Sequence, residues 1–423
     1  MKTDVFWWRG FTPLSDQPLE SDLEVDFLVV GAGFTGLNAA LTLREHGSVA
    51  VVDTVAPGFG ASGRNGGFCC VGGVGYDPAS ARQKYGEAVG QSIQQYLFDA
   101  IDHVDGLIAH ESSIKHSNDG ERMMVMSAIE HRHYQQAALV PPYRYIDAVH
   151  LKDQGYRLNG VLGVLHLDKG FAIQPYAYVR HLYQRCLDAG VDCYYPETIE
   201  HLTSLANHGV QAELSSGRKV KARKVLLACN GYGELSALKG RRIPVLSNII
   251  ATQPIDDSRW QSQGWTQCNM VYDDRHLLHY FRRLPDGRLL FGGRGGLIDT
   301  SRGLALRAAR LQRFAKQYFP DLGDIEIDTA WGGWVTLRPN LNPYLGPLDA
   351  EGHLWCSMGY HGNGVAAGSY SGHQVAKAML ALPNQIPSPF KQHGPKLPLP
   401  RLRPVYLSGI YAALHAIDWW QHR

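Results

Sequence analysis

The sequence predicts an α/β fold into which an α+β part is inserted. Near the N-terminus, an apolar run over 26–30, a glycine turn and a helix-forming segment follow one another, which is the order of a strand–turn–helix unit. Two later apolar runs, 277–283 and 288–293, flank Pro285-Asp286-Gly287 and predict an antiparallel hairpin. Because 423 residues are long for one domain, we expect two domains or one core with an elaborate insertion.

The glycine turn has the spacing G-x-G-x-x-G and contains Gly31, Gly33 and Gly36. Gly31 permits a tight turn, Gly33 lets backbone N–H groups approach a pyrophosphate, and Gly36 lets the helix pack closely on the strand. The helix N-terminus adds partial positive charge. A second apolar run, 49–52, ends at Asp53, whose carboxylate can accept hydrogen bonds from a ribose diol. Together these features predict a Rossmann-like nucleotide-binding unit.

Composition limits the possible partners and the compartment. The net charge of +2 gives no general case for nucleic acid. The seven cysteines include no C-x-x-C pair, and their odd number argues against a full disulfide framework. We see no signal-peptide pattern at the N-terminus and no run of about 18 apolar residues, so we expect a cytoplasmic protein. No H-E-x-x-H motif is present, and we expect no metal site.

The remaining segments suggest how the two parts share the chain. Helical patterns cover 79–114, 176–189, 303–318 and 405–423, and a buried strand over 224–229 returns the chain to the nucleotide unit. We expect a discontinuous nucleotide-binding domain over 20–85, 166–240 and 326–381. A second domain is expected over 86–165 and 241–325, and a proline-rich linker with a C-terminal helix over 382–423.

Glycine-rich loops occur in three distant places, 31–36, 60–67 and 359–368. The loop over 58–67 repeats the glycine spacing without a preceding strand or a following helix, so it is not a second dinucleotide site. A long cofactor that is contacted from both ends of the chain suits FAD better than a nicotinamide nucleotide. The loop 58–67 resembles the loop beside the flavin ring in the D-amino acid oxidase superfamily. The similarity is strongest to the branch of glycine oxidase-like and gamma-glutamylputrescine oxidoreductase-like enzymes, with further matching elements at 34–37, 228–231, 290–293, 331–333 and 359–362.

The resemblance implies a Rossmann-like FAD-binding domain with an inserted antiparallel-sheet substrate domain. It also implies which positions hold FAD. Around the pyrophosphate and ribose these are Gly31, Gly33, Phe34, Thr35, Gly36 and Asp53; along the flavin loop, Ser62, Arg64, Asn65, Gly66 and Gly67; near the adenine, Thr198 and Ile199; and at the later turns, Asn230, Gly231, Gly359, His361, Gly362, Asn363, Gly364 and Val365. Cys69 and Cys70 adjoin the flavin loop, where buried small residues are favoured over covalent flavin attachment.

The activity implied by the resemblance is oxidation of the C–N bond of an amine or amino acid, with hydride transfer to the flavin and hydrolysis of the imine. An amino acid substrate calls for a bidentate arginine. Arg338 is the preferred candidate, because 337–346 resembles the glycine oxidase motif whose arginine binds the substrate carboxylate. Tyr280 and His361 are the other candidates on the substrate side, and Arg294 is a weaker one.

Alternatives stay open at this point. A flavoprotein monooxygenase would share the N-terminal motif, and a non-catalytic subunit could keep FAD for structure or electron relay. The electron acceptor is oxygen or a quinone. The aromatic helix at 405–423 is expected to pack on its own domain rather than on a membrane or partner.

Overall fold

The computed structural model describes residues 4–75, 78–137, 139, 141–153, 156–205 and 209–422. Its first sheet has the strand order β17-β18-β11-β1-β2-β8, in which the pairs from β18 to β8 are parallel. A β9–β10 hairpin is added antiparallel to β11. The strands are β1 (Leu23–Val30), β2 (Val49–Val52), β8 (Asp192–Tyr194), β9 (Ile199–Leu205), β10 (Gly209–Leu214), β11 (Lys219–Leu227), β17 (Tyr344–Pro347) and β18 (Leu354–Met358).

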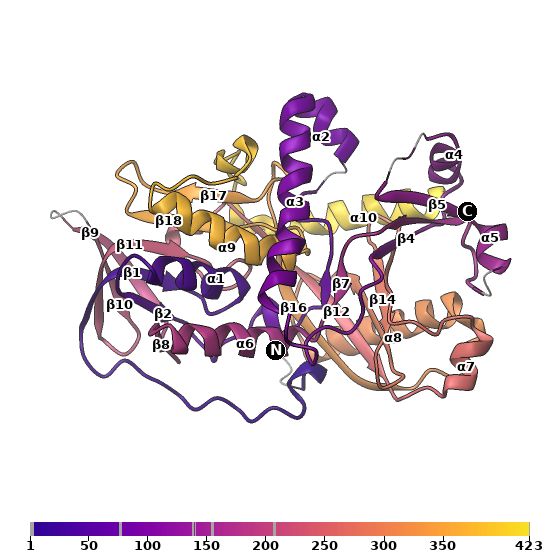
Figure 1. Cartoon of the computed structure of the whole chain (residues 1–423), viewed down its shortest axis with the longest axis horizontal. Coiled ribbons are helices and arrows are strands. Elements are labelled where there is room, and N and C mark those ends of the chain that lie inside the picture. The colour runs from indigo at the N-terminus through magenta and orange to yellow at the C-terminus, as the bar shows by residue number, and fades with distance from the viewer. Residues whose placement is uncertain are drawn as a thin grey trace.

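Three helices accompany this sheet: α1 (Phe34–Arg44), α6 (Pro175–Asp188) and α9 (Ala366–Met379). Helix α1 packs against both α6 and α9 (Figure 1). Leu28 and Val29 on β1 are fully buried on opposite sheet faces, which explains why the strand reads as a continuous apolar run. The predicted strand–turn–helix unit is therefore present, and it places the glycine turn at the carboxyl end of β1.

The second sheet has the order β16-β12-β15-β14-β13-β4-β6-β5 and is antiparallel except for the parallel pair β13–β4. Helices α7 (Asp257–Ser262) and α8 (Ser301–Tyr318) lie on its side of the molecule (Figure 1). The strands are β4 (Glu121–Val125), β5 (Tyr143–Asp147), β6 (Gly163–Leu167), β12 (Ile243–Thr252), β13 (Met270–Asp273), β14 (His279–Arg283), β15 (Leu289–Arg294) and β16 (Ile327–Leu337).

Strand β14 divides its side chains between two environments. Phe281 is fully buried and stacks on Phe291, with ring centroids 5.5 Å apart, in an aromatic core beneath α8. The preceding residue, Tyr280, points to the other face, where its hydroxyl lies 3.0 Å from the Ser247 hydroxyl. Because strand side chains alternate, one face of this sheet faces the core and the other is available for a site.

The structure differs from the sequence-based expectations at two places. The helical stretch predicted over 79–114 divides into α2 (Pro78–Tyr85) and α3 (Glu87–Leu107), because Gly86 between them has φ of +86° and cannot continue a helix. Residues 326–381 were assigned to the nucleotide-binding domain, but β16 lies in the second sheet, since it pairs with β12 from Ile243 to Thr252. The other domain limits remain predictions.

The smaller elements are the two-stranded sheet of β3 (Phe68–Cys69) and β7 (Phe171–Ala172), and the helices α4 (Ala128–Gln136), α5 (Ala148–Asp153) and α10 (Arg403–Gln421). Helix α10 packs on the second sheet's side of the molecule (Figure 1). Asp418 accepts backbone hydrogen bonds from His276 and Leu277, and His422 Nε2 lies 2.9 Å from Asp274 Oδ1. In the described part of the chain, no helix is both long and apolar enough to cross a membrane.

Candidate functional site

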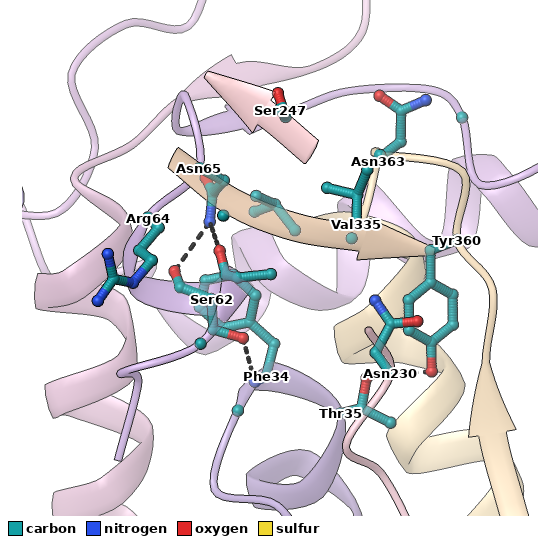
Figure 2. A pocket seen from close by; sticks show the side chains of 18 of the residues that line it. Phe34, Thr35, Ser62, Arg64, Asn65, Asn230, Ser247, Val335, Tyr360 and Asn363 are labelled. Atoms are coloured by element: carbon teal, nitrogen blue, oxygen red, sulfur yellow. Dashed lines mark hydrogen bonds between the residues drawn. The ribbon is translucent and has the colours of Figure 1, made fainter. Parts of the chain in front are cut away.

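A cavity of about 700 Å³ is lined by residues of both sheets. Its size is within the range of small-molecule and cofactor sites. It begins at the end of β1 and the start of α1, passes the loop 58–67 and the start of α9, and continues over the face of the second sheet that carries Tyr280. Figure 2 shows this arrangement, with Ser62 and Asn65 on one side of the pocket and Asn230 and Tyr360 on the other.

At the α1 end, the backbone approaches the cavity closely. Gly33 is the N-cap of α1, and a Cβ atom at this position would come within 2.8 Å of Ser62 Oγ. Ser62 Oγ accepts a hydrogen bond of 3.0 Å from the Phe34 N–H, which joins the loop 58–67 to the helix start (Figure 2). The positive end of α1 therefore faces the cavity with little side-chain bulk, as a pyrophosphate requires.

Asp53 lies at the end of β2 beside this helix start. Its Oδ2 accepts a hydrogen bond of 2.7 Å from the Ala32 N–H, and burial raises the pKa of its carboxyl to about 6. The carboxylate also lines the cavity, so it has room to accept hydrogen bonds from ribose hydroxyls. The predicted adenine positions, Thr198 and Ile199, line the same end of the cavity.

The loop 58–67 is held in one conformation by its own side chains. Asn65 Nδ2 donates hydrogen bonds to the carbonyls of Ala61 and Ser62, at 3.1 and 2.8 Å. Arg64 Nε donates to the Phe59 carbonyl at 2.6 Å, and Trp331 Nε1 donates to the Arg64 carbonyl at 2.8 Å. These bonds present Ser62, Arg64, Asn65 and Gly66 to the cavity as a fixed wall.

The start of α9 forms the opposite wall, where Gly362, Asn363, Gly364 and Val365 line the cavity. The turn before it is fixed by Tyr360, whose hydroxyl bonds with Thr35 on α1 and Ser357 on β18. Asn230 Oδ1 accepts a hydrogen bond of 3.0 Å from the Gly359 N–H. A second helix N-terminus thus faces the same cavity and can stabilise negative charge on a ligand.

Some of the predicted cofactor residues do not line the cavity but lie next to residues that do. The positions that do not line the cavity are Gly36, Gly67, Gly231, Gly359 and His361. Gly36 packs so tightly on the turn that a Cβ atom there would lie 1.8 Å from the Gly31 carbonyl oxygen. Gly359 has φ of +89°, and a Cβ atom would come within 2.7 Å of the Arg338 side chain. For these residues, contact with the cofactor stays a prediction that the geometry does not favour.

The donor set fits FAD, because two helix N-termini and the Asp53 carboxylate surround one elongated cavity. The sequence profile of the FAD dependent oxidoreductase (DAO) family matches residues 26–378 of the chain. The chain belongs to this family. The enzyme is therefore an FAD-dependent oxidoreductase of the D-amino acid oxidase superfamily, as the motifs predicted. Within the described residues, no group of three histidine, cysteine or acidic side chains is placed to hold a metal ion.

Known proteins similar to this enzyme cover most of its length. The probable oxidoreductase OrdL of Rhizobium meliloti is 30% identical over 384 residues, which span 86% of this chain and 85% of the relative. The gamma-glutamylputrescine oxidoreductase of Escherichia coli is 26% identical over 398 residues, or 85% of each chain. The crystal structure of glycine oxidase from Geobacillus kaustophilus has a TM-score of 0.71 at 17% identity, covering 87% of this chain and 98% of that one. The structural similarity to this glycine oxidase shows that the two proteins share a fold.

The structure places Arg338 away from the cavity. This side chain is only 1% exposed and does not line the cavity. Its guanidinium donates hydrogen bonds to the carbonyls of Asn342 and His393, and lies over the Tyr344 ring. Burial lowers its pKa to about 10. Because the guanidinium is engaged with backbone carbonyls away from the cavity, binding of a substrate carboxylate by Arg338 stays a prediction that this geometry does not favour.

The other predicted substrate residues are placed differently from one another. Tyr280 lines the cavity, whereas the His361 ring is buried behind its wall and burial lowers the His361 pKa to about 3. Arg294, which the sequence ranked lower, does line the cavity. Its Nη2 donates a hydrogen bond of 2.9 Å to the His361 carbonyl, and among the described residues its guanidinium makes no other hydrogen bond. His361 therefore acts through its backbone, which positions Arg294.

Sequence reasoning missed the acidic and aromatic residues at the far end of the cavity. Glu121 on β4, Tyr143 on β5 and Tyr272 on β13 all line it. They lie on one sheet face, because Tyr272 pairs with Met123, and Leu167 pairs with both Glu121 and Tyr143. The sequence around 121–125 has little periodicity and gives no clear signal, and only the strand pairing joins these segments into one site.

Proposed function

We propose that the enzyme oxidises the C–N bond of an amine or amino acid. The observation that carries this proposal is that the cavity does not end at the cofactor cradles but continues over the face of the second sheet. This leaves a lined space beside the loop 58–67 in which a small substrate can lie against the cofactor. The names of the relatives above, a gamma-glutamylputrescine oxidoreductase and a glycine oxidase, support an amine or amino acid as the substrate.

When bound, FAD supplies the hydride acceptor for the reaction. The substrate carbon loses a hydride and its neutral amine loses a proton, so that an imine forms, and water then hydrolyses the imine to a carbonyl compound and free amine or ammonia. The protein has to bind the substrate, orient its C–H bond and hold the amine unprotonated. Burial of the surrounding groups favours the neutral amine, since a desolvated ammonium has a lowered pKa.

Arg294 replaces Arg338 as the residue that we propose for binding a substrate carboxylate. It lines the cavity next to Tyr280, and its guanidinium is held by the His361 carbonyl. Burial lowers the Arg294 pKa, but a guanidinium still stays charged and offers a fork that matches a carboxylate. We propose that the Tyr280 hydroxyl, bonded to Ser247, helps to orient the same substrate.

Reduction of the flavin by substrate alone tests the proposal. The purified yellow holoenzyme is mixed anaerobically with amines and amino acids, without a nicotinamide nucleotide. The absorbance of the oxidised flavin, at about 450 nm, is then followed. Bleaching by an amine or amino acid supports the proposal. Bleaching only by NADPH would indicate a monooxygenase, and no bleaching by either would indicate a non-catalytic subunit. Reoxidation by air or by a quinone then identifies the electron acceptor.

We also propose a cytoplasmic location. All seven cysteines are free, and five of them are buried, which suits a reducing compartment. Because α10 is bonded to the second sheet through Asp418 and His422, we propose no membrane role for this helix.

A further inference from the structure

Glu121 is a buried carboxylate that faces the cavity with one oxygen unused. The residue is 4% exposed and lies at the start of β4. Its Oε1 accepts a hydrogen bond of 3.3 Å from the Val71 N–H. Among the described residues, Oε2 has no hydrogen-bond partner. A buried carboxylate needs a donor or a counter-ion, since leaving it unpaired is unfavourable. The Cys70 thiol, a weak donor, also bonds with this carboxyl group, and a ligand in the cavity can supply a stronger donor to Oε2, because Glu121 is part of the cavity wall.

The neighbours of this carboxylate are aromatic. Tyr143 and Tyr272 line the same part of the cavity, and the strand pairing places them near Glu121. Burial raises the pKa of both hydroxyls, and the charge of Glu121 raises it further. Tyr134 on α4 lines this end as well. Tyrosine faces attract cations through the ring quadrupole, and an anionic side chain among them adds a direct counter-ion. This combination selects a positively charged group and disfavours a carboxylate.

We propose that this end of the cavity binds a cationic group of the substrate, with Glu121 as its counter-ion and Tyr143 and Tyr272 beside it. The reaction itself rests on the proposed function. The amine that reacts has to be neutral, so the bound cation is a second group on the same molecule. The substrate class is therefore an amine with two nitrogen centres: a diamine, a polyamine or a basic amino acid.

The sheet geometry sets the spacing between the two groups. Tyr280 lies on β14, and Glu121 lies two strands away on β4. Neighbouring strands are about 4.8 Å apart, and Glu121 is two residues along β4 from Met123, which is in register with Tyr280 through Tyr272, so the two positions are about 12 Å apart. An aliphatic chain of several methylenes between the two nitrogens spans such a distance, and the apolar side chain of Met123 lines the surface between them.

Binding of a cation that cannot be oxidised tests the site without relying on turnover. tert-Butylamine is cationic near neutral pH and has no hydrogen on the carbon that bears nitrogen, whereas tert-butanol has a similar shape without charge. Isothermal titration of the holoenzyme should give a Kd for tert-butylamine that is at least about tenfold lower than that for tert-butanol. Glu121→Gln should remove this preference. Asp119→Asn, which removes a carboxylate from the exposed turn just before β4, should leave it unchanged.

The pH dependence gives a readout on the unaltered enzyme. Burial raises the Glu121 pKa to about 8, so the affinity for tert-butylamine should fall as the pH is lowered from 8 to 6 and the carboxylate takes up a proton. The titratable groups that face Glu121 are Cys70, Tyr143 and Tyr272, and all have pKa values raised by burial, so they stay neutral over this range. Arg82 also acts on Tyr143 and lowers the pKa of its hydroxyl, against the larger effect of burial. Binding should also release a proton at pH 7.

A substrate pair then tests the assigned class. The ratio of kcat/KM for 1,8-diaminooctane to that for octylamine should exceed about tenfold and should fall towards one in Glu121→Gln. Equal affinity for tert-butylamine and tert-butanol in the unaltered enzyme overturns the proposal, even if amines bleach the flavin. Conversely, if tert-butylamine binds through Glu121 but no amine bleaches the flavin, the cation site stands and the proposed function fails.

Discussion

Replacement of Arg338 by methionine should destabilise the enzyme without changing its affinity for substrate. The side chain is 1% exposed, and its guanidinium donates to the carbonyls of Asn342 and His393. A hydrogen bond from a charged donor contributes about 1.5–3 kcal/mol, so the loss of two such bonds should lower the free energy of unfolding by about 3–6 kcal/mol. Methionine keeps most of the apolar volume against Tyr344, so the polar contacts are the main loss.

The expected loss corresponds to a measurable change in melting temperature. A chain of 423 residues has an unfolding entropy of roughly 0.9 kcal/mol/K from the usual value per residue, which converts the loss into about 3–7 °C if the enzyme unfolds in one step. Thermal unfolding followed by circular dichroism measures this shift. Steady-state kinetics at a temperature well below the transition should give a KM for carboxylate substrates within about twofold of the unaltered enzyme.

Arg294→Met is the matched comparison. It removes a guanidinium that lines the cavity, and so it should lower kcat/KM for an amino acid by about tenfold to a hundredfold while FAD stays bound. A simple amine without a carboxylate should be affected much less. The reasoning is refuted if Arg338→Met raises KM for carboxylates steeply and keeps the melting temperature, because the guanidinium would then have to reach the substrate.

Three further outcomes are expected. Asp53→Ala should raise the Kd for FAD by about tenfold or more, measured by recovery of flavin fluorescence, because the carboxylate that faces the ribose is lost. Tyr280→Phe removes the hydroxyl that bonds to Ser247 and should raise KM several-fold, about 1 kcal/mol, while leaving the flavin spectrum and FAD content unchanged. Glu121 should destabilise the ligand-free fold as the pH rises from its unfolded pKa of 4.5 towards 8, because the folded protein holds this proton more tightly than the unfolded chain. The loss approaches a few kcal/mol (about 1.4 kcal/mol per unit of pKa shift), so Glu121→Gln should melt above the unaltered protein at pH 8 and near it at pH 5.

The nucleotide-binding part could be predicted because its signals are local. The glycine spacing, the apolar strand and the acid at Asp53 follow one another within 26–53, and each has a direct physical reason. The loop 58–67 carries its own hydrogen-bonding side chains, so its sequence also determines its conformation. The conformation of such segments is set by local interactions and does not depend on how the rest of the chain folds.

The placement of Arg338 could not be derived from its local sequence. The stretch 337–346 supplies an arginine at a plausible place, but the direction of its side chain depends on His393, which lies in the proline-rich segment far along the chain. Glu121 is the opposite case, a residue that lines the cavity but was not predicted from the sequence. It lies in a stretch with little periodicity, and its role depends on the parallel pairing of β4 with β13, which sequence patterns do not indicate. Tertiary contacts decide both cases.

Side chains along β14 point alternately into the hydrophobic core and into the cavity. Phe281 belongs to the aromatic core, whereas Tyr280 lines the cavity, and β13 divides Val271 and Tyr272 in the same way. Variation at every second position can therefore change which molecules the enzyme accepts while the packing under α8 stays intact. A mutant library restricted to 121, 123, 272 and 280 should yield mostly folded proteins with altered preferences, and natural selection has the same freedom to adapt this scaffold to new amines.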